Sequence, residues 1–284
     1  MIRLAIPNKG RLSDPTLKFL AEAGLKVKDA GERMLFANTE NKNVSILFVR
    51  AQDIPRYVEL GAADLGITGQ DLIEETSASV EQLVELDFGY SRVAVAAPDK
   101  NGISNVKQLR GKTIATHLPG ITKKFFKSRN IPVKILQVAG ATEVAPFLGL
   151  AEAIVDQVST GTTLAVHRLK IIETILESKV CLIANKNSMK KNSKIIEGII
   201  LACKGTIDAR EMKYLMMNVK DKKALDRVIR IAPAMESPTI LELAKGGYAV
   251  HLVINERELA NAIRELKQAG AKDLLVLNIE RVVA

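Results

Sequence analysis

The sequence has few residues of the kinds that mark disulfide-bonded, zinc-binding or nucleic-acid-binding proteins. Its 284 residues include two cysteines, Cys181 and Cys203, and three scattered histidines, without the spacing of a disulfide framework or a zinc site. Tryptophan is absent and aromatic residues amount to 4%, so no rings interleave with the lysines to stack on single-stranded nucleic acid. We expect a reduced, cytoplasmic protein without a nucleic-acid partner.

Long hydrophobic runs are missing as well. The longest apolar runs are well short of the roughly 20 residues that cross a bilayer. The first residues, Ile2–Pro7, have strand character and lack the hydrophobic core and cleavage site of a signal peptide. We therefore expect no membrane segment and no export.

What the sequence does have is an excess of positive charge. The formal net charge of +9 is spread along the chain instead of lying in one tail. Small phosphorylated substrates favour a positive protein. A solvated surface rich in lysine and glutamate would give the same charge, and composition leaves both interpretations open. In Lys186–Lys194 the lysines stand among asparagine and serine, which predicts an exposed loop.

The length and the order of elements predict several domains. A chain of 284 residues with 47% hydrophobic residues exceeds one ordinary core, so two or three domains are expected. Strands and helices alternate, which predicts parallel sheets with helices on both faces. The expected strands are Ile2–Pro7, Val44–Val49, Asp64–Thr68, Tyr90–Ala97, Gly111–Thr116, Val133–Val138 and Ala153–Val155, and the expected helices are Ser13–Ala23, Ile54–Glu59, Gln70–Glu75 and Thr122–Ser128.

The chain is expected to cross between two α/β lobes, near Arg92–Pro98 and again near Lys179–Ala184. Residues 1–93 with 180–209 would form lobe I, and residues 94–179 would form lobe II. A cleft between two such lobes is the expected ligand site.

A third domain is expected in residues 210–284. Its order of elements, β-α-β-β-α-β, is that of a ferredoxin-like domain. The expected strands are Tyr214–Val219, Thr239–Leu243, Tyr248–Ile254 and Asp273–Ile279, with helices Lys222–Arg230 and Arg257–Gln268. Asn255 and Glu258 form a predicted capping pair, and Gly270 ends the second helix. No catalytic set of residues lies here, which favours regulation or assembly.

The most informative segment is the end of the strand Ala153–Val155. Asp156 follows that strand, at the edge where open α/β sheets bind ligands. Next come hydroxyl side chains around one glycine, whose backbone amides suit an anion; these are Ser159, Thr160, Gly161, Thr162 and Thr163. A carboxylate for ribose hydroxyls beside a phosphate loop predicts a sugar-phosphate site. The alternative is an ordinary helix cap.

Charged residues follow two further strands. Lys9 and Arg11 flank a glycine after the first strand, which suits a polyphosphate or, alternatively, a solvated turn. Arg50 follows the strand Val44–Val49 and is a candidate phosphate ligand. Asp53 is either a site residue or the cap of the next helix.

Four more residues are ambiguous from sequence. Asp71 is a candidate site residue or a helix cap, and Glu143 is a candidate contact to adenine or ribose or a first-turn acid favoured by the helix dipole. For His117 and His167 a surface or hydrogen-bonded role is favoured over acid–base catalysis.

Several motifs together resemble one family over essentially the whole chain. They are Ile6–Leu12, Arg50–Pro55, Ala63–Gly69, Gly140–Leu164 and Met235–Thr239. This ordered set resembles ATP phosphoribosyltransferase, the first enzyme of histidine biosynthesis, in its long form. The resemblance implies a two-lobed, periplasmic-binding-protein-like catalytic core followed by a ferredoxin-like regulatory domain.

The resemblance also implies the reaction. The phosphoribosyl group of phosphoribosyl pyrophosphate is transferred to N1 of the adenine of ATP, and pyrophosphate is released. Mg²⁺ would be held mainly by pyrophosphate, with no protein ligand certain. The implied protein is cytoplasmic, forms homo-oligomers (dimer and hexamer) and is inhibited by histidine.

Residue roles implied by the resemblance follow the motifs. Asp156 and Glu152 would face the ribose hydroxyls, and the loop from Ser159 to Thr163 would hold the 5-phosphate. Lys9 and Arg11 would serve the phosphates of ATP or of the product. The chain departs from the family pattern at three places: Glu152 replaces an aspartate, Gln157 replaces an apolar residue, and Val166–Arg168 follows the loop in place of a more usual polar turn.

In the third domain the resemblance ties the segment ending at Thr239 to feedback control. Ser237 and Thr239 would bind the carboxylate of histidine. The family often has an aspartate near the end of the domain's first strand, where this chain offers Asn218 and, less well aligned, Asp221. The alternative is a domain that serves oligomerisation alone.

Two other classes share the two-lobed plan. A solute-binding protein would bind without chemistry, but export signals are missing and a third domain is added. Porphobilinogen-polymerising deaminases need a cysteine that carries the cofactor, and neither Cys181 nor Cys203 has a suitable glycine-rich setting.

Overall fold

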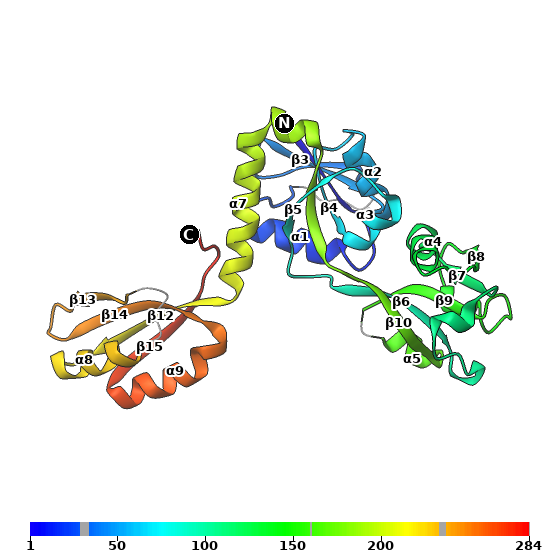
Figure 1. Ribbon diagram of the computed structural model, residues 1–284. Coiled ribbons are helices and arrows are strands. Elements are labelled where there is room, and N and C mark those ends of the chain that lie inside the picture. Colours follow the sequence, from blue (N-terminus) through cyan, green and yellow to red (C-terminus); the bar gives the residue numbers. More distant parts are fainter. Residues whose placement is uncertain (29–33, 160, 233–236, 284) are drawn as a thin grey trace. The chain divides into compact units, whose positions relative to one another are not determined.

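The computed structural model describes residues 1–28, 34–159, 161–232 and 237–283 (Figure 1). The chain forms two compact units, Met1–Glu197 and Gly198–Ala284. The boundary between them falls within the helix α7 (Ser193–Arg210).

The first sheet of the N-terminal unit has six strands, and two neighbouring strands near its middle are buried along their whole length. Its order is β2-β3-β1-β4-β11-β5. The strands are β1 (Ile2–Pro7), β2 (Phe36–Asn38), β3 (Val44–Val49), β4 (Leu65–Gly69), β5 (Glu81–Glu85) and β11 (Val180–Ala184). All five residues of β4 are buried, as expected of a strand covered on both faces. Covering helices include α1 (Ser13–Glu22), α2 (Ile54–Glu59) and α3 (Gln70–Thr76), with the short turn η1 (Ala51–Asp53) before α2.

The second sheet of this unit has the order β10-β6-β9-β7-β8. Its strands are β6 (Ser91–Pro98), β7 (Thr113–Thr116), β8 (Lys134–Gln137), β9 (Ala153–Val158) and β10 (Leu169–Ser178). The helical elements are α4 (Pro119–Ser128), α5 (Thr162–Val166), η2 (Asp99–Asn101), η3 (Val106–Leu109) and η4 (Thr142–Val144). A core of aliphatic and phenylalanine side chains, including Phe126 and Ile114, lies between this sheet and α4.

The expectation of purely parallel sheets is wrong. β7 runs parallel to β8 and β9, but β6 is antiparallel to β9 and to β10, and β11 is antiparallel to β4 and β5. The reason is the connectivity: a chain that leaves one sheet, builds another and returns adds its outgoing and returning strands in opposite directions.

The two connections between the sheets lie side by side. Ser91, the first residue of β6, pairs with Ser178, the last residue of β10. β5 ends at Glu85 and β11 starts at Val180, so both connections are short. The two-lobed α/β core expected from the sequence is confirmed.

The prediction of a loop over Lys186–Lys194 is wrong. The segment holds the helix α6 (Lys186–Lys191) and the start of α7. Buried Asn185 begins α6: its side chain accepts hydrogen bonds from the amides of Asn187 and Ser188 and donates one to the carbonyl of Val58 at 2.8 Å. This cap satisfies the first helix amides, and the lysines then lie on the solvent side.

The C-terminal unit confirms the ferredoxin-like prediction. Its elements are β12 (Met212–Val219), α8 (Lys222–Ile231), β13 (Thr239–Glu242), β14 (Tyr248–Asn255), α9 (Glu256–Ala269) and β15 (Ala271–Asn278), and the antiparallel sheet has the order β13-β14-β12-β15. Alternate residues of β12 and β14, among them Leu215 and Leu252, are buried in a core with the helices. The Asn255 side chain caps α9 through the amide of Arg257, and Gly270 ends it with a φ of 109°.

Within the described residues, no helix is long and apolar enough to cross a membrane.

Candidate active site

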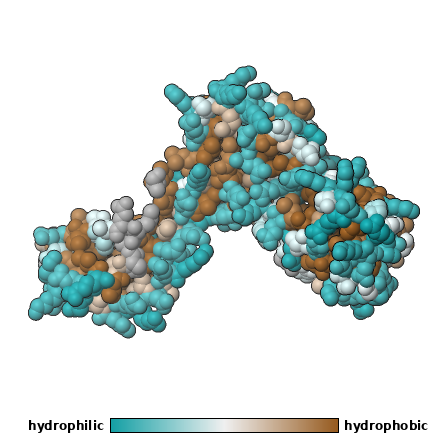
Figure 2. All heavy atoms as spheres, viewed as in Figure 1, coloured by the Kyte–Doolittle hydropathy of each residue, from teal (hydrophilic) through white to brown (hydrophobic). Residues whose placement is uncertain are grey.

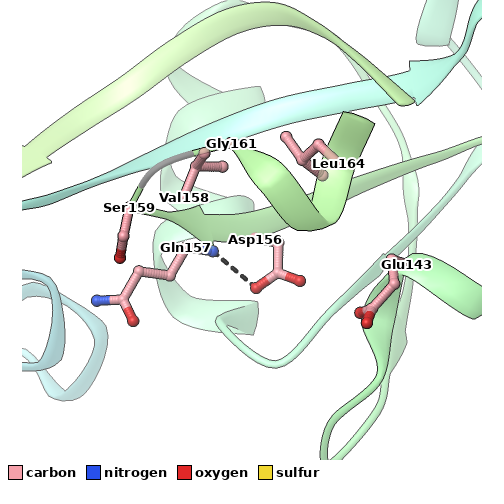
Figure 3. Close-up of a pocket in the computed structure, with 7 residues that line it drawn as sticks. All are labelled: Glu143, Asp156, Gln157, Val158, Ser159, Gly161 and Leu164. Atoms are coloured by element: carbon pink, nitrogen blue, oxygen red, sulfur yellow. Dashed lines mark hydrogen bonds between the residues drawn. The ribbon is translucent and has the colours of Figure 1, made fainter. Parts of the chain in front are cut away.

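A pocket of about 270 Å³ lies where β9 ends (Figure 3). Its lining residues are Glu143, Asp156, Gln157, Val158, Ser159, Gly161 and Leu164. Gly161 has a φ of +79°, and its carbonyl accepts the amide of Ala165 at 3.0 Å as α5 begins. The sequence therefore places a tight, glycine-dependent turn directly after the strand. Thr160 and the side chain of Thr163 lie outside the described residues, while Thr162 is the first residue of α5.

Asp156 is held from two sides. Its Oδ1 accepts the amide of Gln157 at 2.7 Å and lies 3.2 Å from Nδ1 of His117. His117 directly follows β7, the parallel neighbour of β9, so the carboxyl ends of both strands meet at one edge of the sheet. The hydrogen bond to Asp156 raises the pKa of His117 above its ordinary value, against the lowering by burial.

Glu143 supplies a second carboxylate to this pocket from η4. In Figure 3 Asp156 and Glu143 lie on one side, while the side chain of Gln157 extends to the other. None of the described lining residues is basic. The carboxylate side of the pocket therefore suits hydroxyl groups or a cation, and an anion would have to be held by the amides and hydroxyls of the loop.

Gln157 reaches from the second lobe to the first. Its Nε2 donates to Oδ2 of Asp71 at 2.6 Å and to Oγ of Ser91 at 3.0 Å. Oδ1 of Asp71 accepts the hydroxyl of Ser178 at 2.6 Å. Asp71 is 2% exposed, and both of its oxygens are taken by these partners. The structure thus corrects the expectation that Asp71 faces substrate or caps α3: its carboxylate joins the two lobes.

Arg11 belongs to the same interlobe network. Its guanidinium donates to the carbonyl of Gly89 at 2.8 Å and to Oγ of Ser91 at 3.1 Å, on the outgoing connection between the lobes. Burial lowers the pKa of Arg11, and the charge of Asp71 partly opposes this. Because Arg11 contacts the connection through both terminal nitrogens, the structure gives it a role in fixing the lobes besides any contact to phosphate.

Glu152 lies at the opposite end of β9 from Asp156. Its Oε2 accepts the amide of Thr113, the first residue of β7, at 2.8 Å. Four residues of extended strand separate the two side chains by roughly 13 Å at about 3.3 Å per residue. The expectation that both acids face one ribose is corrected: Glu152 holds the amino ends of β7 and β9 together.

Lys9 and Arg50 follow neighbouring strands of the first sheet. β1 and β3 pair in parallel, so these two residues lie at the same edge, and both are exposed. Asp53 sits before α2 without a side-chain hydrogen bond to that helix, which does not support the capping alternative. The edge presents two cations to solvent.

In the C-terminal unit, Asn218 donates from Nδ2 to Oδ2 of Asp273 at 3.1 Å. Asp221 caps α8 by accepting the amide of Ala224 at 2.9 Å. Ser237 and Thr239 are exposed, and Thr239 pairs with His251 across β13 and β14. Met235 and Glu236, the start of the feedback motif, lie outside the described residues.

The two cysteines do not suit a covalent cofactor. Cys181 and Cys203 are buried, and burial raises the pKa of each thiol to about 12. Thiols that stay protonated are poor nucleophiles, which argues against the deaminase alternative.

Comparison with known proteins decides the family. Residues 50–205 match the family model described as ATP phosphoribosyltransferase, and residues 209–281 match the model described as HisG, C-terminal domain. The chain belongs to the ATP phosphoribosyltransferase family. A protein of that name from Methanocella arvoryzae is 45% identical over the full length of both chains. One from Methanothermobacter thermautotrophicus is 44% identical over 99% of both.

A solved structure of the ATP phosphoribosyltransferase family is also similar. It is the ATP phosphoribosyl transferase (HisG:HisZ) complex from Thermotoga maritima, with a TM-score of 0.62 and 29% identity. The match covers 72% of this chain and 98% of that chain. The match thus takes in nearly all of the matched protein and leaves part of this chain outside it.

For two residues at this candidate site, the structure shows contacts that the sequence did not indicate. Gln157 was visible only as a polar residue in an apolar position, and that departure was its signal. For His117 the expected hydrogen-bonded role agrees with its contact to Asp156, but only the parallel pairing of β7 and β9 shows which residue is its partner.

Proposed function

We propose that this chain transfers the phosphoribosyl group of phosphoribosyl pyrophosphate to N1 of ATP, at the pocket beside Asp156. The observation that carries the assignment is the pairing of a partly exposed carboxylate, 20% exposed, with a hydroxyl- and glycine-rich loop at the end of one strand. Family membership supports the reaction, and this geometry supports its location at the pocket beside Asp156.

The chemistry is a displacement at the anomeric carbon of the ribose. The bond from C1 to the pyrophosphate oxygen breaks, and a bond from C1 to N1 of adenine forms. Positive charge develops on the ribose as the leaving group departs, so a carboxylate on the ribose hydroxyls strengthens its hold in the transition state. We assign this role to Oδ2 of Asp156, and Glu143 lines the same pocket. N1 is a neutral nucleophile, so positioning matters more than a protein base.

The 5-phosphate is assigned to the loop of Ser159, Thr160, Gly161, Thr162 and Thr163. The positive φ of Gly161 supports this assignment because it bends the backbone into a tight turn. Lys9 and Arg50 are assigned to the phosphates of ATP, since both are exposed cations at the edge of the first sheet. Arg11 and Asp53 are assigned supporting positions at the same edge.

Mg²⁺ would neutralise the departing pyrophosphate. Among the described residues no three His, Cys, Asp or Glu side chains are grouped to hold a metal. Mg²⁺ usually keeps several water ligands and binds substrate phosphates, so we assign the ion mainly to the pyrophosphate oxygens.

We further propose three functional parts: residues 1–93 with 180–209 as lobe I, 94–179 as lobe II, and 210–284 as a domain that senses histidine. Ser237 and Thr239 would bind the carboxylate of histidine, with Asn218 nearby on the same sheet. Inhibition requires histidine to bind one state of the enzyme better than another.

The same domain is proposed to assemble copies of the chain in the cytoplasm, as dimers and hexamers. Leu241, Leu275 and Leu277 are 53%, 57% and 47% exposed. They pair with Ala249, Met216 and Tyr214, which alternate with the buried residues of β12 and β14. The sheet face opposite the helices is therefore apolar, and Figure 2 shows hydrophobic surface on this unit. A face of this kind favours association.

The test is pyrophosphate release from ATP, phosphoribosyl pyrophosphate and Mg²⁺ by the purified chain. Release that depends on both substrates supports the assignment. Gly161→Val should weaken binding of phosphoribosyl pyrophosphate, because a β-branched residue at positive φ distorts the loop, with Gly102→Val as a control at another exposed positive-φ turn. Binding of a small ligand without pyrophosphate release would instead favour the solute-binding alternative.

Histidine sensing has its own test. Histidine titrated into the full chain should reduce turnover, and Ser237→Ala combined with Thr239→Val should blunt that inhibition. Unchanged inhibition in the double variant would move the histidine site elsewhere.

A further inference from the structure

Among the described residues, His117 is the histidine that contacts a carboxylate of the pocket, that of Asp156. It follows β7, and its Nδ1 is 3.2 Å from Oδ1 of Asp156. The side chain is 34% exposed, so one part is packed and another faces solvent. The chain has three histidines, and none of them is among the described residues that line the pocket; His117 lies beside the pocket through its contact to Asp156.

We propose that His117 is a positioning residue for Asp156 and that its positive charge strengthens binding of phosphoribosyl pyrophosphate, so that this binding weakens as pH rises. The inference rests on the proposed function of the pocket. It adds a specific residue and a pH dependence to that function.

Hydrogen-bond donors that face the carboxylate of Asp156 hold it in position. Oδ1 faces two donors, the amide of Gln157 at 2.7 Å and His117. Two donors on one oxygen fix the carboxylate plane, and we assign Oδ2 to the ribose hydroxyls. A neutral imidazole with its proton on Nδ1 still donates, so deprotonation removes the charge but not the hydrogen bond.

The positive charge of His117 is favoured by the acidic groups that face it. These are Asp156 from β9 and Asp71 and Glu75 from α3. Two of these acids have other partners: Asp71 is bonded to Ser178 and Gln157, and Glu75 accepts the amides of Gly120 and Ile121 at 2.9 Å each. Together the acids raise the pKa of His117, with the hydrogen bond to Asp156 as the largest cause.

The protonation of His117 should favour binding of phosphoribosyl pyrophosphate. Phosphoribosyl pyrophosphate is a polyanion, and no described residue lining the pocket is basic. Protonated His117 is thus a nearby cation for it, and binding favours the protonated enzyme. KM for phosphoribosyl pyrophosphate should be lowest below the pKa of His117 and rise as pH passes through that value.

The first test is an NMR pH titration of the three imidazoles, which needs no turnover. His117→Gln assigns its signal by removal. We expect His117 to titrate above the ordinary pKa of histidine, and Asp156→Asn to move the pKa of His117 down toward that ordinary value. An unshifted His117 in the wild type, or one unmoved in Asp156→Asn, overturns the inference and leaves the transferase assignment intact.

The second test separates charge from positioning in the kinetics. His117→Gln keeps a donor without charge, so KM for phosphoribosyl pyrophosphate should rise about three- to tenfold at low pH and lose its pH dependence, with kcat nearly unchanged. His117→Ala removes the donor as well and should also lower kcat. His167→Gln is the matched control. The ring of His167 packs against Phe147, with 5.9 Å between the ring centroids, so this variant should leave both kcat and KM unchanged. A pH-dependent KM that persists in His117→Gln overturns the inference, whereas absence of pyrophosphate release in the wild type overturns the proposed function itself.

Discussion

Asp156 and Asp71 lie close together in the structure and differ in what their surroundings leave free. Asp156 is 20% exposed, and its described partners share one oxygen. Asp71 is 2% exposed, and partners from β9 and β10 take both oxygens. The carboxylate of Asp71 thus serves the fold, whereas we propose that the more exposed carboxylate of Asp156 serves a ligand. Gln157 joins the two regions, because its amide group contacts Asp71 while its backbone amide contacts Asp156.

The largest effect should come from Asp156→Asn. The amide keeps the size of the side chain but loses the charge that stabilises the developing positive ribose. We expect kcat/KM to fall about ten- to a thousandfold, which corresponds to roughly 1.4–4 kcal/mol of transition-state stabilisation. Steady-state kinetics measure this, and a melting temperature near that of the wild type is the control. Near-normal turnover in a folded variant would remove Asp156 from the reaction.

Asp71→Ala should act on stability first. It leaves the Ser178 hydroxyl and the Gln157 amide without their acceptor and removes the charge that faces Arg11. We expect the free energy of unfolding of the N-terminal unit to fall by about 2–4 kcal/mol, measured by denaturant unfolding. Asp99→Ala, at an exposed turn, is a control that should cost little. If Asp71→Ala were as stable as the wild type but inactive, the comparison would fail, since Asp71 would then belong with Asp156.

Gln157→Leu restores the apolar residue typical of the family and tests the link between the two regions. The backbone amide to Asp156 remains, while the side-chain bonds to Asp71 and Ser91 are lost. We expect a loss of about 1–2 kcal/mol in stability, as for one broken buried hydrogen-bond set, and a smaller fall in kcat/KM than in Asp156→Asn. Gln157→Glu keeps the shape of the side chain but adds a charge. Because its carboxylate would face that of Asp71, we expect it to lower the free energy of unfolding more than Gln157→Leu does.

The smallest effect should come from Glu152→Gln. The amide oxygen can still accept the Thr113 amide, so stability should change by less than about 1 kcal/mol. Activity should stay within about twofold of the wild type, because the side chain lies at the far end of β9. Kinetics as poor as those of Asp156→Asn would contradict the separation of the two acids.

Sequence reasoning succeeded where the information is local. Hydrophobic periodicity and the cap residues placed β1, β9, α9 and the order of the C-terminal elements. It failed for α6, because lysine-rich composition gave no sign that Asn185 would be buried against Val58 and begin a helix. It also missed β10, which mixes charged residues with isoleucines and has an irregular register against β6.

The sequence by itself determined the family, the strand-end position of Asp156 and the glycine turn after it, because each depends on residues adjacent in the chain. Tertiary structure decided which partners the carboxylates of Glu152 and Asp71 have. Glu152 and Asp156 stand four positions apart in one motif, yet an extended strand carries them to opposite edges of the sheet. Asp71, Gln157 and Ser178 are far apart in sequence and meet only because the chain passes twice between the lobes at one place. Local sequence reports which groups are present, but whether a carboxylate is left free depends on partners that only the folded chain brings to it.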